Sequence, residues 1–149
     1  MSRRTALILL GVIVGAVGLN TVVAVVARHG GAGASFAPLQ LPVYGGFSAV
    51  GVIAGWIGWQ LVRRRSTRPR SLLMVLVPVV TVLSVVPDVA LLALQFIPDS
   101  NATAVAALMV MHVVVVALAV PGYLLAAPVE ARDAGDVAIR PHRAPGLTS

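Results

Sequence analysis

Four long apolar stretches dominate the chain, and segments that are polar or rich in Gly and Pro separate them. The stretches cover residues 5–27, 43–62, 72–96 and 102–127. An α-helix rises about 1.5 Å per residue, so roughly 20 apolar residues cross the hydrocarbon core of a bilayer. The pattern predicts an all-α membrane protein with one domain, residues 1–127, in which four transmembrane helices form an antiparallel up-down bundle. The polar residues 128–149 are predicted to be a disordered cytoplasmic tail.

The first stretch raises the alternative of a cleaved signal peptide, because Ala32 and Ala34 form a small-x-small site. The apolar core of a signal peptide is about 7–15 residues long, and the stretch from Thr5 to Ala27 is much longer. We therefore expect an uncleaved membrane helix at the start of the chain.

The positive charges indicate the orientation of the bundle. All 11 basic residues are arginine, and all but Arg28 lie before the first stretch, within residues 63–70 or in the tail. Short cytoplasmic loops of membrane proteins are enriched in Lys and Arg. Both termini are therefore predicted to be cytoplasmic, with the protein in the inner (plasma) membrane of a bacterium. The arginines cluster beside apolar stretches rather than along one helical face, so we expect no nucleic-acid partner.

Composition narrows the possible chemistry. Of the 149 residues, 58% are hydrophobic and 11% are charged, and the sequence has no Cys. Thiol catalysis, iron–sulfur clusters and Cys-ligated zinc are therefore excluded. A bis-histidine haem needs two facing histidines, yet His29 and His142 lie outside the apolar stretches. We expect no metal, no cofactor and no catalytic residue, and nothing in the sequence predicts an enzyme.

Glycines recur at helical spacing in the first two stretches, and each set lies on one helical face. Small residues let two helix backbones approach closely where lipid supplies no hydrophobic drive. In antiparallel helices the two sets would also match in depth. We therefore expect spans one and two to be the closest pair of helices, in contact through Gly11, Gly15 and Gly18 on one side and Gly58, Gly55 and Gly51 on the other. The alternative is that Gly is simply frequent in membrane helices.

A candidate polar site lies inside the spans and consists of Asn20, Ser48, Ser84, Asp88 and His112. Asp88 and His112 are the ionisable members, and a charged group at a helix centre costs roughly 2.5–3.5 kcal/mol on insertion scales. A short connector joins their two spans, so these helices should be antiparallel neighbours and the two side chains should meet. Asn20 is the exception, because it projects roughly opposite to the glycine face of its own helix.

Two interpretations of the polar site stay open. It is either a buried hydrogen-bond network that fixes the helix register, or a proton-coupled or ligand-binding site. The first interpretation favours a small accessory or structural membrane subunit, whose partners are the lipid bilayer and either another membrane protein or a second copy of the chain. The alternative function is small-molecule binding or proton-coupled transport through Asp88 and His112.

The segment VVPDVALL, followed by a short connector and the segment ALMVMHVVVVALAVPGYL, carries a resemblance to a known family. Together they resemble an uncharacterised actinobacterial family of four-span membrane proteins, the domain of unknown function 6069. The resemblance covers about residues 5–127. It implies a multipass bacterial membrane protein and assigns no activity.

The arginine asymmetry generates a prediction about topology. A single Cys introduced by Ser66→Cys should not react with a membrane-impermeant thiol reagent in intact cells, because residues 63–70 are expected on the cytoplasmic side. The same Cys should react once the cells are permeabilised. Labelling in intact cells would show that the orientation is opposite to the predicted one.

Overall fold

The chain is described by a computed structural model, which covers residues 2–33, 35–94 and 97–129. The described residues form four long α-helices, α1 (Arg3–His29), α2 (Leu41–Arg65), α3 (Pro69–Leu94) and α4 (Ala102–Ala126), and a short 3-10 helix, η1 (Ala37–Leu39). Each long helix is apolar enough and long enough to cross a membrane. The predicted all-helical, four-span fold is confirmed. The predicted disordered tail falls largely on residues 130–149, which lie outside the described residues.

The helices extend beyond three of the four apolar stretches, because they continue into flanking residues that hydropathy does not count. Ser2 caps α1, and its side chain accepts a hydrogen bond from the Thr5 N–H. Asn101 caps α4 in the same way through the Ala104 N–H. Helix α3 runs unbroken through Pro78 and Pro87. Each helix start that carries a cap has one of its unpaired backbone donors satisfied by a side chain.

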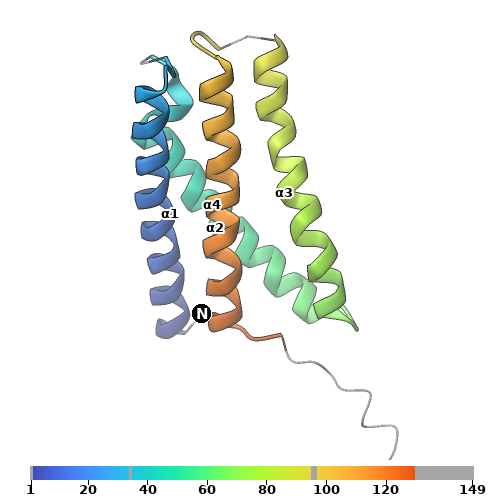
Figure 1. Cartoon of the computed structure of the whole chain (residues 1–149). Helices are drawn as coiled ribbons and strands as arrows, with labels where there is room; N and C mark the ends of the chain where they lie inside the picture. Colours follow the sequence, from blue (N-terminus) through green and yellow to red (C-terminus); the bar gives the residue numbers. More distant parts are fainter. Residues whose placement is uncertain (1, 34, 95–96, 130–149) are drawn as a thin grey trace, which may run out of the picture.

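Helix α4 is the centre of the bundle, because it packs against each of the other three long helices (Figure 1). Its contact with α1 is the most extensive of all helix pairs. At Gly122 of α4, an added Cβ would overlap the Val12 side chain of α1. Among the four spans, α4 is the most buried and α3 the least.

The expected glycine contact between spans one and two is wrong. Cβ atoms built at Gly11, Gly18 and Gly58 would meet nothing within 4 Å. The other three glycines face α4 instead, with Gly15 near Leu118, Gly51 near Val115 and Gly55 near Tyr123. Helix α1 buries a different small face, formed by Ala16, Asn20, Ala24 and Ala27. The glycine spacing correctly showed a face without bulk, but it did not identify the helix that this face meets.

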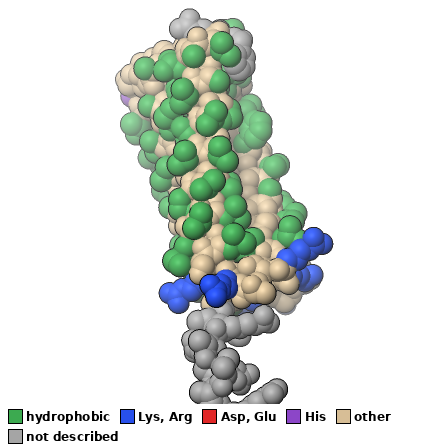
Figure 2. Space-filling view, turned by 90° about the vertical axis from the view of Figure 1, so that its right-hand side faces the viewer, with side chains coloured by type: hydrophobic (Ala, Val, Ile, Leu, Met, Phe, Trp, Pro, Cys, Tyr) green, Lys and Arg blue, Asp and Glu red, His purple; other side chains and the backbone are tan. Residues whose placement is uncertain are grey.

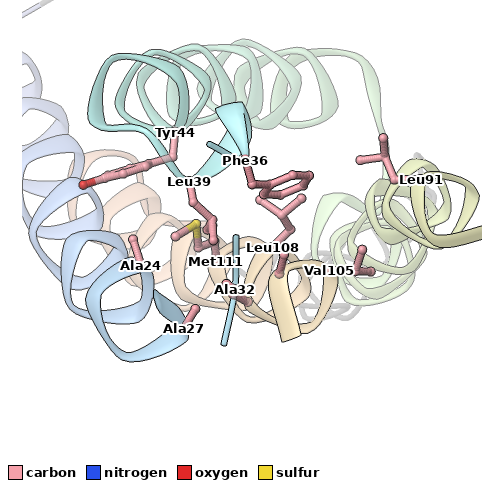
Figure 3. Packing of buried hydrophobic residues seen from close by; sticks show 12 residues of the cluster. Ala24, Ala27, Ala32, Phe36, Leu39, Tyr44, Leu91, Val105, Leu108 and Met111 are labelled. Carbon is pink, nitrogen blue, oxygen red and sulfur yellow. The ribbon is translucent and has the colours of Figure 1, made fainter. Parts of the chain in front are cut away.

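Two clusters of buried apolar residues lie along the bundle. The first includes Phe36 and Leu39, which come from the segment between α1 and α2 and are fully buried against α4 residues such as Leu108 and Met111 (Figure 3). The second lies toward the arginine-rich end and centres on Trp56, Trp59 and Tyr123. Many large apolar side chains are exposed on the outer surface of the bundle (Figure 2), as expected for a protein surrounded by lipid.

The segment before α2 is fastened to the connector before α4. The Asn101 side chain donates a hydrogen bond to the Gly31 carbonyl at 2.8 Å. Ser35 donates to the carboxylate of Asp99. A side chain at Gly33 would collide with Asp99, so only Gly fits there. These contacts hold Phe36 and Leu39 over the end of the bundle opposite the arginines.

The packing of α1 against α4 predicts a contrast between two glycines. Gly122→Ala should lower the free energy of unfolding by about 1–3 kcal/mol, because the new methyl group meets Val12, whose branched side chain has one preferred rotamer in a helix. Gly11→Ala is the matched control, since nothing lies near its Cβ. That change should be neutral or stabilising by up to about 1 kcal/mol. Unfolding of both variants in detergent would test the contrast, and equal stabilities would contradict it.

Candidate intramembrane polar site

Asp88 of α3 and His112 of α4 are in direct contact. The Nδ1 atom of His112 lies 3.1 Å from Oδ2 of Asp88. The two side chains differ in burial, since that of Asp88 is 7% exposed and that of His112 is 37% exposed. The contact therefore joins a buried carboxyl group to an imidazole ring that reaches the surface of the bundle within the span.

A second contact of His112 indicates where its proton lies. Nδ1 is 2.8 Å from the carbonyl oxygen of Leu108, one turn earlier in α4. A carbonyl can only accept a hydrogen bond, so this contact requires a proton on Nδ1. That N–H points mainly at Leu108, and Oδ2 of Asp88 has no well-directed hydrogen bond within the described part of the chain. The carboxyl group thus lies beside a donor that is already engaged.

Asn20 and Ser48 form a second polar pair, which joins α1 to α2. The Asn20 side-chain amide donates to the Ser48 hydroxyl at 3.0 Å, and both residues are buried. One residue further along α1, the Thr21 hydroxyl lies 2.9 Å from that of Tyr44 in α2. The contact between these two helices therefore has polar pairs where glycines were expected.

Ser84 does not join either pair. Its hydroxyl donates to the Thr81 carbonyl of its own helix at 2.7 Å. The five residues of the predicted polar site therefore separate into two interhelical pairs and one side chain that bonds locally. The position of each residue along its span predicts that all five lie inside the membrane. It does not predict that one polar pair joins α1 to α2 and another joins α3 to α4.

A third polar contact, which the sequence did not predict, joins α4 to α2. The Tyr123 hydroxyl of α4 donates to the Val52 carbonyl of α2 at 2.5 Å. Its ring lies between those of Trp56 and Trp59, with ring centroids 5.6 Å apart in each case. The indole N–H of Trp59 in turn donates to the Ala127 carbonyl at 3.2 Å. No local motif marks Tyr123, because its partners lie on another helix about 70 residues earlier.

The polar pairs do not form a metal site. No group of three or more His, Asp or Glu side chains in the part of the chain that the structure describes could hold a metal ion. What the Asp88–His112 pair can do chemically is share or relay a proton, or offer hydrogen bonds from the exposed edge of the imidazole.

Four apolar helices with paired polar groups between them define a multipass integral membrane protein. The chain belongs to the family described as "Family of unknown function (DUF6069)", whose sequence model matches residues 1–128. No curated protein and no solved structure matches the chain. Membership confirms the resemblance seen in the sequence.

The Asp88–His112 contact predicts coupled effects on stability. His112→Leu leaves a buried carboxyl group without its side-chain partner, so it should lower the free energy of unfolding by about 1–3 kcal/mol. Asp88→Leu should be milder, because His112 keeps its bond to Leu108. The double variant should lose less stability than the two single variants added together, with an interaction energy of about 0.5–3 kcal/mol.

Unfolding of the wild type, both single variants and the double variant in detergent measures this interaction energy. Asp88→Asn serves as the control that keeps the shape of the side chain and replaces one carboxyl oxygen by an amide nitrogen. Strictly additive losses would show that the two residues do not interact.

Proposed function

We propose that this protein is a small accessory subunit of the bacterial plasma membrane that packs against another membrane protein through the surface around His112. The observation that carries the proposal is the exposure of that side chain. His112 lies near the middle of α4, and 37% of its side chain is exposed. A polar ring at this depth faces either lipid or a protein partner.

The remaining ring nitrogen of His112 supports a protein partner. Because Nδ1 carries the proton that Leu108 accepts, Nε2 of a neutral ring is an acceptor. No hydrogen bond to Nε2 is present among the residues described. Lipid tails offer no donor at this depth, whereas a Ser, Thr, Asn or Gln side chain on a neighbouring helix does. We therefore expect the partner to present such a residue in its own membrane span.

The helix beside His112 is also the one that the bundle covers least. Helix α3 is the least buried of the four spans, and its exposed side chains include Val82, Leu83, Val86 and Val89. Apolar exposure alone fits lipid equally well, so it does not indicate a partner. The partner is therefore argued from His112, and the exposed face of α3 is left to lipid or to the same partner.

Proton-coupled transport or small-molecule binding is the second candidate, and one observation favours it. Nδ1 of His112 lies 3.1 Å from Oδ2 of Asp88, close enough for a proton to pass between the two groups once the ring turns away from Leu108. The two described cavities are lined by residues of α2 and of the start of α1, and neither is lined by Asp88 or His112.

Orientation is part of the same proposal. Apart from Arg28, the described arginines lie at one end of the bundle, the end where α1 begins (Figure 2). In Figure 1 the end of α4 lies at that end too. The positive-inside rule supports placing this end, and hence both termini, in the cytoplasm.

Photo-crosslinking in the native membrane tests the proposed partner. A photoreactive amino acid at Val116 or Leu92 lies one turn beyond His112 or Asp88 on the same helical face. Each position should give one crosslinked product of defined mass, in which the linked peptide is a membrane span with a Ser, Thr, Asn or Gln. The same label at Val14, an exposed position on α1, should not give that product.

Substitutions at His112 separate a specific contact from general apolar packing. His112→Leu should abolish the crosslink, whereas His112→Gln, which keeps a hydrogen-bonding side chain, should retain much of it. A product of twice the mass of the chain would show self-association instead of an accessory role. Equal crosslinking from Val14, Val116 and Leu92 would overturn the proposal.

A further inference from the structure

A groove opens at the arginine-rich end of the bundle, between the start of α1 and the end of α2. It has a volume of about 340 Å³ and is lined by Ser2, Thr5, Trp56, Gln60 and Arg64. A second hollow of about 270 Å³ shares Trp56, Gln60 and Arg64 and continues onto Ile57 and Leu61. The two hollows together have one polar part and one apolar part, which meet at the same three side chains.

The charges around the groove are all positive in the residues that the structure describes. The only carboxylates among the described residues are Asp88, within α3, and Asp99, in the connector before α4, and neither lines the groove. The arginines at this end are Arg3, Arg4, Arg63, Arg64, Arg65, Arg68 and Arg70. Clustered positive charge attracts an anion, and its effect is strongest beside a bilayer leaflet that contains anionic lipids.

The polar part of the groove presents hydrogen-bond donors. Arg63 donates to the side-chain oxygen of Gln60 at 3.1 Å, which leaves the Gln60 amide N–H groups for another acceptor. No hydrogen bond or ion pair engages the Arg64 guanidinium within residues 2–33, 35–94 and 97–129. A guanidinium matches the geometry of a phosphate group, which it can bind through two parallel N–H donors.

The apolar part of the groove distinguishes a lipid from a soluble anion. Ile57 is 62% exposed and Leu61 is 50% exposed, and both lie on the outer surface of α2. They continue the groove from Arg64 toward the middle of the span. A free phosphate would have no contact with them, whereas an acyl chain would cover both. Trp56 forms a firm wall, because its ring packs against Tyr123.

The geometry points to an anionic phospholipid bound in this groove, with its phosphate at Arg64 and Gln60 and one acyl chain along Ile57 and Leu61. The lipid comes from the leaflet on the arginine-rich side of the membrane. This site is built by α1 and α2, so it does not depend on the proposed partner at His112.

Quenching of tryptophan fluorescence tests the site in the full chain. Trp56 lines the groove, and Trp59 is the only other tryptophan. In phosphatidylcholine vesicles that contain a minor fraction of lipid brominated on its acyl chains, brominated phosphatidylglycerol should quench more strongly than brominated phosphatidylcholine. Arg64→Gln should reduce this preference about tenfold or more, the loss expected when a charge-assisted hydrogen bond to the anionic lipid is removed.

Arg65→Gln is the matched control, because it removes the same charge from an exposed neighbour that does not line the groove. It should change the preference less than about twofold, since it acts only through the surface potential. Equal losses in the two variants would overturn the site in favour of general charge attraction. Equal quenching by both brominated lipids in the wild type would also overturn it. Complete relief of the quenching by millimolar glycerol 3-phosphate would show that the phosphate alone accounts for binding, which would overturn the acyl-chain part of the site.

Discussion

The hydrocarbon core of a bilayer contains no water, so each polar group placed there must find its partner within the protein or pay for its exposure. This constraint explains where the helices of this bundle touch. Polar contacts join three pairs of helices among the described residues: Asn20–Ser48 joins α1 to α2, Asp88–His112 joins α3 to α4, and Tyr123–Val52 joins α4 to α2. Sliding one helix along its neighbour by a turn would leave several of these groups unpaired in lipid. The polar contacts therefore set the helix register, and the apolar residues fill the space around it.

The central place of α4 follows from the size of its residues. Gly122 and Ala119 let α1 and the aromatic residues of α2 approach its backbone, and Tyr123 then fills the space between the two tryptophans. Helix α3 has no comparable small face and lies at the edge of the bundle (Figure 1). Because lipid tails are as apolar as a leucine side chain, close fit rather than burial from water decides which helices meet. The helix with the closest fit to its neighbours is therefore the most buried one.

What the sequence predicts well is whatever depends on one segment at a time. The four spans follow from local hydropathy, and the Asp88–His112 contact follows from two depths and one short connector. The glycine contact failed because it depended on which helices become neighbours, and spacing within a helix carries no information about that. Asn20 already indicated the error. Its side chain points away from the glycine face, and the structure shows that the side with Asn20 and Ala16 is the one that α1 buries.

The two tryptophans also show that a local sequence pattern does not reveal which residues become neighbours in the fold. Trp56 and Trp59 lie close to the arginines in the sequence, where tryptophan commonly sits among lipid headgroups. Both are instead buried against Tyr123, at 8% and 5% exposure. Their burial leaves Gln60, Arg64 and the exposed apolar residues of α2 as the surface that we propose for the lipid. Helices α1 and α2 form that surface, whereas α3 and α4 form the surface around His112. A substitution at either surface therefore leaves the side-chain contacts at the other surface in place. The proposed lipid and the proposed protein partner can therefore be tested separately, each through substitutions that leave the surface of the other unchanged.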